Sequence, residues 1–262
     1  TIDGLRGFLA IAVFIHHSTI WFQYIKESNW RLPDSNLYIH FGETSVALFF
    51  MITSFLFITK LINTKENEFN WKSFFISRFY RLAPMYYFSV LLILICILQM
   101  SHWTLHTDLF SFIKSLLNWL LFTLTGRPDI NNFAFTDKVN AGVTWSLTYE
   151  WLFYFSLPII ALFISSKKSK PLFLFISVLF IVFFFSYNTG QVYHIYAFLG
   201  GSIAPFLFKY NFINTKTKNN IASIIVIVCL LVIRQFSWAK NEYCMVLISI
   251  VFTLIAMGTS LF

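Results

Sequence analysis

The stretch Pro171–Tyr187 reads PLFLFISVLFIVFFFSY and contains no charged side chain. A helix needs about 20 predominantly apolar residues to cross the hydrocarbon core of a bilayer, and this run approaches that length. Lipid offers no hydrogen-bond partners to the backbone, so a segment in lipid must satisfy its own N–H and C=O groups, as a helix does. We therefore expect Pro171–Tyr187 to be a transmembrane helix.

The rest of the chain has the same character. Its 262 residues are 58% hydrophobic and include 34 phenylalanines, whereas only 11% are charged. A soluble domain carries about 25% charged residues, and so few charges could not cover a surface that faces water. This composition excludes a soluble cytoplasmic enzyme, a disordered chain and a disulfide scaffold. It predicts an all-α fold, a polytopic bundle of transmembrane helices.

Eight apolar runs are interpreted as spans. They lie at about 5–25, 44–62, 84–100, 143–164, 171–187, 192–208, 221–236 and 243–262. No soluble domain or internal repeat interrupts them. We expect one transmembrane domain over residues 1–262. Its N-terminal end is expected to be incomplete, because the chain begins at Thr1 and not at a methionine.

The segment 110–124 is amphipathic and could either span the membrane or lie in its interface. Cytoplasmic loops are rich in Lys and Arg, and this bias decides between the two options. If the segment does not span and the N-terminus is cytoplasmic, the inside holds twelve of the 19 basic residues and three acids, Asp3, Glu66 and Glu68. If the segment spans, the clusters 167–170 and 209–218 move outside. We therefore predict a re-entrant or surface helix on the extracytoplasmic side.

The net charge of +8 does not indicate a nucleic-acid partner. The basic residues form short clusters between apolar runs, without the basic and aromatic stripe that follows a phosphate backbone. The partner that this charge pattern predicts is the lipid bilayer. The three cysteines, Cys96, Cys229 and Cys244, lie in or beside apolar runs and are expected to pack rather than to form disulfides.

Ionisable side chains within apolar runs are costly and are candidate functional residues. Arg6 and His17 are eleven residues apart, which in a helix places them about 20° from the same azimuth and roughly 16 Å apart along the axis. Asp3, three residues before Arg6, can pair with it. The alternative is structural: Arg6 extends to the headgroups, and His17 is a packed polar residue bonded to a neighbouring helix.

Arg78 and Arg81 are i,i+3 neighbours at the cytoplasmic end of the third run. Two adjacent guanidinium groups suit a phosphate or pyrophosphate group. An ordinary positive anchor at the membrane surface explains the same pattern.

Glu150 is the only acid within a long apolar run, and Ser146 lies one turn before it. A carboxylate in such a place must be protonated, paired or functional. It could pair with His17 or Arg6, or it could accept a hydrogen bond from the hydroxyl of an acceptor. Its aromatic neighbours Tyr149 and Trp151 could stack on a sugar, although an interfacial aromatic belt is the commoner explanation.

Other polar residues are weaker candidates. His102 and His106 have an i,i+4 metal-ligand spacing with Asp108 nearby, but no further ligand is apparent and we expect no metal site. Glu43 is interpreted as the boundary of the second run.

Four segments, in order and in register, resemble the acyltransferase-3 family of integral membrane O-acyltransferases, which modify bacterial surface glycans. They are Asp3-Gly4-Leu5-Arg6-Gly7 with His17, Gly42 to Leu56, Arg78-Phe79-Tyr80-Arg81 with Pro84 and Tyr86, and Trp145-Ser146-Leu147 with Glu150, Phe153 and Tyr154. The resemblance covers residues 1 to about 158, and beyond them the chain matches only as generic apolar spans.

The resemblance implies transfer of an acyl group, commonly acetyl, from cytoplasmic acyl-CoA to an acceptor hydroxyl on a glycan or its lipid-linked precursor. It maps the active-site histidine onto His17 and the acyl-CoA-binding arginines onto Arg6, Arg78 and Arg81. We expect Glu150 to take part in catalysis, with Asp3, Trp145 and Ser146 in support. His17 is expected to act as a general base, with a covalent acyl-histidine as the alternative. No bound cofactor is expected, since acyl-CoA is a co-substrate.

The resemblance also predicts a multi-pass protein of the bacterial inner membrane. Family members usually have about ten spans, so eight would indicate a chain that is incomplete at its C-terminal end. The chain departs from the family pattern at Ala47, at Thr53-Ser54 and at Ser77, where the family often has an acid, Ser-Gly and a further arginine.

Two other functions compete with acyl transfer. A transporter or flippase for a glycan or glycolipid would use its buried charges to bind substrate or relay protons, and broken helices in paired halves would indicate it. No such symmetry is apparent in the sequence. A non-catalytic anchor would tolerate alanine at His17, Arg78, Arg81 and Glu150.

Overall fold

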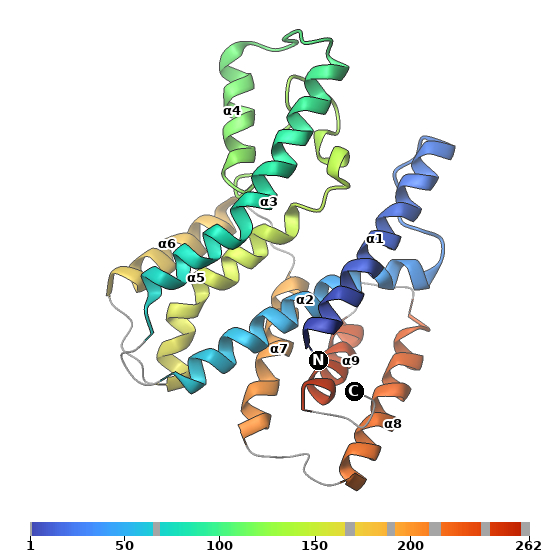
Figure 1. Ribbon diagram of the computed structural model, residues 1–262, viewed down its shortest axis with the longest axis vertical. Helices are drawn as coiled ribbons and strands as arrows, with labels where there is room; N and C mark the ends of the chain where they lie inside the picture. The colour runs from blue at the N-terminus through green and yellow to red at the C-terminus, as the bar shows by residue number, and fades with distance from the viewer. Residues whose placement is uncertain are drawn as a thin grey trace. The chain divides into compact units, whose positions relative to one another are not determined.

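The structure is a computed structural model that describes residues 2–64, 69–165, 171–187, 192–209, 216–236 and 242–257. Every regular element in these ranges is a helix, so the predicted all-α fold is confirmed. The α-helices, labelled in Figure 1, are α1 (Ile2–Glu27), α2 (Asn36–Asn63), α3 (Trp71–Met100), α4 (Leu109–Leu120), α5 (Trp145–Ser165), α6 (Pro171–Tyr187), α7 (Val192–Lys209), α8 (Lys216–Ile233) and α9 (Glu242–Ala256). The 3₁₀ helix η1 (Thr136–Asn140) lies between α4 and α5 in the sequence.

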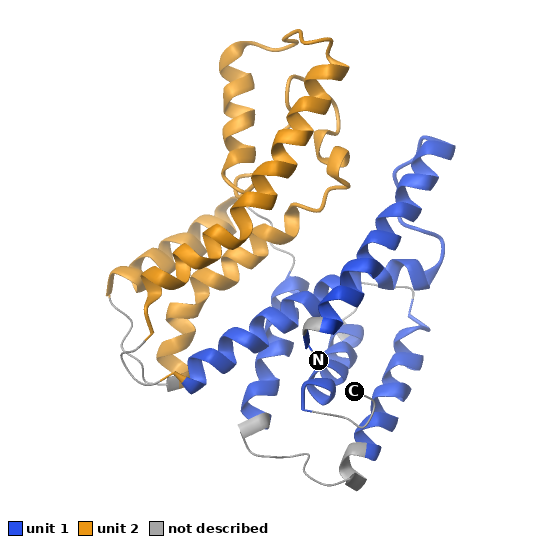
Figure 2. Ribbon diagram, in the orientation of Figure 1, with its two compact units in different colours: residues 1–63, 191–262 blue, residues 64–190 orange. Residues whose placement is uncertain are grey.

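The chain forms two compact units, each of which is described by itself (Figure 2). Unit 1 consists of residues 1–63 and 191–262, so it joins the first two helices to the last three. Unit 2 is the intervening segment, residues 64–190, and contains α3 to α6.

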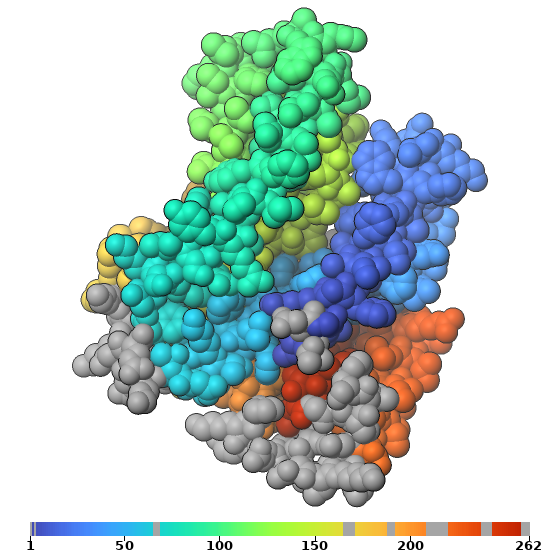
Figure 3. All heavy atoms as spheres, viewed as in Figure 1, coloured from blue at the N-terminus to red at the C-terminus, as the bar shows by residue number. Residues whose placement is uncertain are grey.

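In unit 1, α2 is the central helix and packs against α1, α7 and α9. Glycine allows α7 to approach α2 closely: a Cβ added at Gly201 would lie 2.2 Å from the carbonyl oxygen of Met51. Met51 and Ile52 are completely buried at this contact. In contrast, α1 lies on the surface of unit 1 (Figure 3). Its Phe8 and Phe14 are more than 70% exposed. Exposed phenylalanines are expected where a helix faces lipid and not water.

In unit 2, α5 packs against α6, and α3 packs against α4 and η1. The side chain of Asn70 caps α3 by accepting a hydrogen bond from the backbone N–H of Ser73 at 3.0 Å. α3 continues through Pro84 to Met100. Further along it, the Tyr86 hydroxyl donates to the carbonyl oxygen of Trp119 at the end of α4, and Trp119 is completely buried. This bond fixes α4 to α3.

Four of the described helices, α1, α2, α3 and α5, are long and apolar enough to cross a membrane. The other four predicted runs also form apolar helices, but their described lengths are shorter than a full span. The eight predicted spans therefore correspond to four long helices and four shorter ones. Each of the helices α6 to α9 borders residues outside the described ranges, so the structure does not define its full length. The chain is a multi-pass helical membrane protein.

Most of the segment 110–124 lies in the twelve-residue helix α4, which ends at Leu120 and is followed by a turn. At 1.5 Å per residue such a helix is about 18 Å long, well short of the ~30 Å hydrocarbon core. Asp108 caps its N-terminus: the backbone N–H of Ser111 donates to the carboxylate at 2.8 Å and lowers the pKa of Asp108. Apolar side chains such as Phe110 and Leu117 are exposed along the helix. A helix of this length does not cross the hydrocarbon core, and its place at the membrane surface stays a prediction.

The second span begins earlier than the sequence indicated. The prediction placed its start at Thr44 with Glu43 as a boundary residue, but α2 begins at Asn36, so Glu43 lies two turns inside the helix. Residues 36–43 carry His40 and Glu43, and these polar residues masked the start of the apolar pattern.

Candidate active site

The predicted Arg6 and His17 lie on the continuous helix α1, as the spacing required. Both are half-buried, and the side chain of Asp3 lies outside the described part of the structure. Nδ1 of His17 is buried and has no hydrogen-bond partner among the described residues. An imidazole with an unpaired ring nitrogen can still accept or donate a proton.

His16 is more buried than His17, at 5% exposed. Its Nδ1 lies 2.7 Å from the carbonyl oxygen of Tyr38, and its ring is 5.1 Å from the ring of His17. The imidazole also packs on Gly42 of α2, where an added Cβ would lie 2.5 Å from Cδ2 of His16. His16 is therefore a structural contact between α1 and α2. The sequence analysis did not identify this contact.

The two predicted arginines of α3 differ in their surroundings. Arg78 is half-buried, its Nη2 donates to Oγ of Ser77 at 3.1 Å, and its guanidinium lies 6.0 Å from the centre of the Phe74 ring. Arg81, one turn later, is exposed. Only Arg81 is therefore fully available to a phosphate group in solution.

Glu150 lies in α5, half-buried, as the apolar run predicted. Its Oε1 accepts a hydrogen bond from the hydroxyl of Tyr154, one turn further along the helix. Arg78 of α3 also forms a hydrogen bond with the Tyr154 hydroxyl. A carboxylate, a phenol and a guanidinium are thus connected within unit 2. We call Arg78, Glu150 and Tyr154 the α3–α5 cluster.

Trp145 and Ser146, the predicted supporting residues, lie in the first turn of α5. Oγ of Ser146 donates to the carbonyl oxygen of Val143 at 3.1 Å, which gives the side chain a local structural role. Trp145 contacts Tyr149 edge to face, with 6.0 Å between the ring centres. Both side chains are half-buried.

The predicted site residues therefore fall into two groups. Asp3, Arg6 and His17 belong to unit 1, and Arg78, Arg81 and Glu150 belong to unit 2. The structure joins Glu150 to Arg78 through Tyr154, a link that sequence reasoning missed. The spacing Glu150–Tyr154 is i,i+4 and could have indicated the contact on α5. The pairing of Glu150 with His17 or Arg6 stays a prediction.

Sequence reasoning also underrated Glu43. Its carboxylate interacts electrostatically with the hydroxyl of Tyr193 on α7, within unit 1. Glu43 is thus a second acid inside a long apolar helix, in addition to Glu150.

The weak metal hypothesis receives no support from the geometry. Nε2 of His106 is 2.7 Å from Oγ1 of Thr104, and Asp108 serves as the cap of α4. Within the described ranges, no group of three or more His, Cys, Asp or Glu side chains could hold a metal ion.

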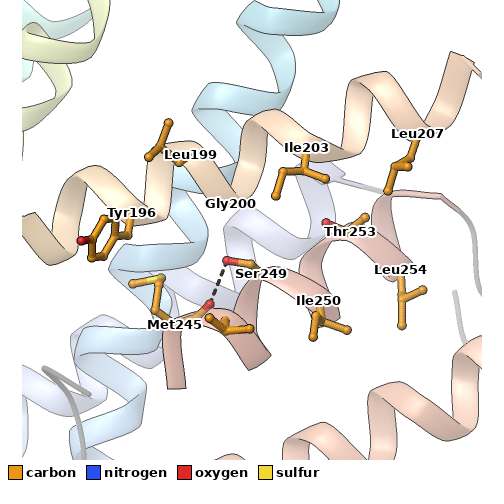
Figure 4. Close-up of a pocket in the computed structure, with 11 residues that line it drawn as sticks. Tyr196, Leu199, Gly200, Ile203, Leu207, Met245, Ser249, Ile250, Thr253 and Leu254 are labelled. Atoms are coloured by element: carbon orange, nitrogen blue, oxygen red, sulfur yellow. Dashed lines mark hydrogen bonds between the residues drawn. The ribbon is translucent and has the colours of Figure 1, made fainter. Parts of the chain in front are cut away.

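Unit 1 also contains an apolar groove of about 610 Å³ between α7 and α9 (Figure 4). Its lining is aliphatic apart from Tyr196, Ser249 and Thr253, and the Ser249 hydroxyl donates to the carbonyl oxygen of Met245 at 2.8 Å. None of its described lining residues is an acid, a histidine or a basic residue. The groove therefore has no group for acid–base chemistry, and the ionisable residues of α1, α3 and α5 are the better candidates.

Comparison with protein families decides between the functions that the sequence left open. The model of the acyltransferase-3 family, described as an acyltransferase domain, matches residues 1–262. The chain belongs to the acyltransferase-3 family. The match covers the C-terminal spans, which the sequence motifs did not reach. No curated protein and no solved structure matches this acyltransferase.

Proposed function

We propose that this membrane acyltransferase moves an acetyl group from cytoplasmic acetyl-CoA to a hydroxyl of a cell-surface glycan or its lipid-linked precursor. Family membership supports acyl transfer in general. The observation that carries the proposal is His17, a half-buried imidazole with an unpaired Nδ1 on a long apolar helix. An ionisable residue in that position is costly and is retained where it has a function.

His17 acts as the general base in this proposal. Its imidazole takes the proton of the acceptor hydroxyl as the oxygen attacks the thioester carbonyl. The carbon–sulfur bond then breaks, and the CoA thiolate leaves and takes up the proton from the imidazolium. Histidine suits this role, because its ordinary pKa lies near neutral pH. Acyl-histidine formation is the alternative route, in which the ring nitrogen itself attacks the thioester.

Arginines serve the donor. CoA carries phosphate groups, and guanidinium binds phosphate through paired hydrogen bonds. We assign Arg6, Arg78 and Arg81 to the donor side, with Arg81 as the exposed contact. The excess of Lys and Arg on one side of the membrane supports a cytoplasmic N-terminus in the bacterial inner membrane.

Glu150 and its neighbours serve the acceptor. A carboxylate on an apolar helix can accept a hydrogen bond from a sugar hydroxyl, and Trp145 and Ser146 lie about one turn away on the same helix. Aromatic side chains offer flat apolar surfaces against which the apolar face of a sugar ring can pack.

Inverted membrane vesicles test the proposal, since they expose the cytoplasmic face to added donor and retain native glycans. Vesicles that contain the wild-type chain and are supplied with labelled acetyl-CoA should accumulate label in the glycan fraction. Mild base should release this label as acetate. Vesicles without the chain are the control. Absence of transfer, with acceptor translocation that needs no acyl-CoA, would instead identify a transporter.

A further inference from the structure

Tyr154 is almost completely buried, at 1% exposed, and its ring is held on two sides by other aromatic rings. The Phe74 ring of α3 lies 5.8 Å away and the Trp151 ring of α5 lies 5.9 Å away, both nearly perpendicular to it. The ring is therefore fixed, and the position of its hydroxyl is fixed with it. A buried phenol hydroxyl needs a hydrogen-bond partner, and this one has two, Glu150 and Arg78.

The direction of these hydrogen bonds follows from the chemistry of the groups. A guanidinium can only donate, and an ionised carboxylate can only accept. The Tyr154 hydroxyl therefore accepts from Arg78 and donates to Glu150. Charge at both ends makes each bond stronger than a neutral one.

The same contacts keep Arg78 directed into unit 2. Its guanidinium is engaged by Tyr154 and Ser77 and lies beside the Phe74 ring. Arg81 is exposed one turn later on the same helix. Two arginines that share a sequence motif thus have different environments.

We propose that Tyr154 is a positioning residue that links Arg78 to Glu150, so that Arg78 holds the carboxylate in place while Arg81 binds the donor's phosphates. This rests on the proposed function, since it assigns tasks within acetyl transfer. It revises the assignment of both arginines to the donor. Without the phenol, Glu150 loses one charge-assisted hydrogen bond, and the guanidinium loses its link to the carboxylate.

Steady-state kinetics on the full chain in detergent micelles test the proposal. Labelled acetyl-CoA is the donor and polyprenyl-phosphate-linked N-acetylglucosamine is the acceptor probe. Tyr154→Phe removes one oxygen and should lower kcat about tenfold, the rate equivalent of one hydrogen bond to a charged group. Its donor KM should stay within about twofold of the wild-type value.

Variants of the two arginines test the second part of the proposal, the division of tasks between Arg78 and Arg81. Arg81→Lys should raise the donor KM about tenfold at nearly unchanged kcat, because a lysine cannot form the paired phosphate contact. Arg78→Lys should lower kcat without raising the donor KM, like Tyr154→Phe. The double variant with Tyr154→Phe and Arg78→Lys should have a kcat only slightly below that of either single variant, because both changes disrupt the same network. If Tyr154→Phe does not fold, the two lysine variants still decide the proposal.

Tyr80→Phe is the matched control, since Tyr80 lies beside Arg81 on α3 but is 71% exposed. It should leave both kinetic constants unchanged. Wild-type kcat in Tyr154→Phe, or equal increases in donor KM for the two lysine variants, would overturn the inference. A purely structural role predicts less folded protein at wild-type kcat per folded molecule, which also overturns it. If the wild-type chain releases no CoA and labels no acceptor, the proposed function itself fails.

Discussion

The histidine pair of α1 and the α3–α5 cluster are both polar groups within apolar helices, but they are organised differently. In the cluster, the carboxylate of Glu150 and the guanidinium of Arg78 share the Tyr154 hydroxyl. In the histidine pair, His16 is bonded and buried, whereas His17 retains an unpaired ring nitrogen. Groups held by charged partners keep a fixed position, and an imidazole nitrogen without a hydrogen-bond partner is available for proton transfer.

Breaking the α3–α5 cluster should have the largest effect on stability. Glu150→Ala leaves a buried phenol and a half-buried guanidinium without their carboxylate, which should lower the free energy of unfolding by about 3 kcal/mol. Titration with SDS in mixed micelles measures the change. Glu150→Gln is the matched control, because it keeps an oxygen for Tyr154 and should cost much less. Equal stability of wild type and Glu150→Ala would show that the cluster does not hold α5 to α3.

Disrupting the contact between α1 and α2 should have the second-largest effect on stability. Gly42→Ala places a Cβ 2.5 Å from Cδ2 of His16, so the imidazole must move away from the Tyr38 carbonyl. We expect a loss of about 2 kcal/mol, typical of overpacking. Gly7→Ala on α1 is the control, since an added Cβ there meets nothing within 4 Å. Equal melting temperatures for the two variants would argue against the packing of His16 on Gly42.

The two histidines should separate stability from activity. His16→Ala removes the bond to Tyr38 and should cost roughly 1.5 kcal/mol, while most transfer activity per folded molecule remains. Thermal unfolding followed by circular dichroism gives the first quantity, and label transfer gives the second. A stable but inactive His16→Ala protein would exchange the roles assigned to His16 and His17.

The smallest effect is expected where charges meet on the surface. Arg31 pairs with Glu27 at 3.0 Å and with Asp34 at 3.2 Å, but these side chains are between 42% and 72% exposed. Arg31→Ala should change stability by less than about 0.5 kcal/mol, because solvent screens such pairs. If Arg31→Ala lowered the free energy of unfolding as much as Glu150→Ala, burial would not explain the difference between the surface ion pairs and the α3–α5 cluster.

Much of the fold could be predicted from the sequence, because apolar runs report directly on burial in lipid. The run 171–187 coincides with α6, and α4, for which the charge bias predicted no span, is only twelve residues long. The start of α2 was predicted wrongly, because His40 and Glu43 form contacts within unit 1 that a local pattern does not reveal. The described parts of α6 to α9 are apolar but shorter than a full span.

The sequence supplied the candidate residues, whose catalytic roles stay a prediction, and the structure supplied the contacts between them. Periodicity indicated that Arg6 and His17 share a face, and polarity singled out Glu150. The link through Tyr154 depends on side-chain contacts between α3 and α5, such as that of the Phe74 and Tyr154 rings, which neither helix encodes alone. The difference between Arg78 and Arg81 has the same origin, because only the packed structure shows that Arg78 is half-buried and Arg81 exposed.

The central claim is that His17 is the base of an acetyl transfer. The most direct test compares wild type with His17→Ala in inverted vesicles supplied with labelled acetyl-CoA, at equal amounts of folded protein. Loss of a general base should reduce label in the glycan by at least about 100-fold, while the melting temperature stays close to that of wild type. Full transfer by a folded His17→Ala protein would contradict the account.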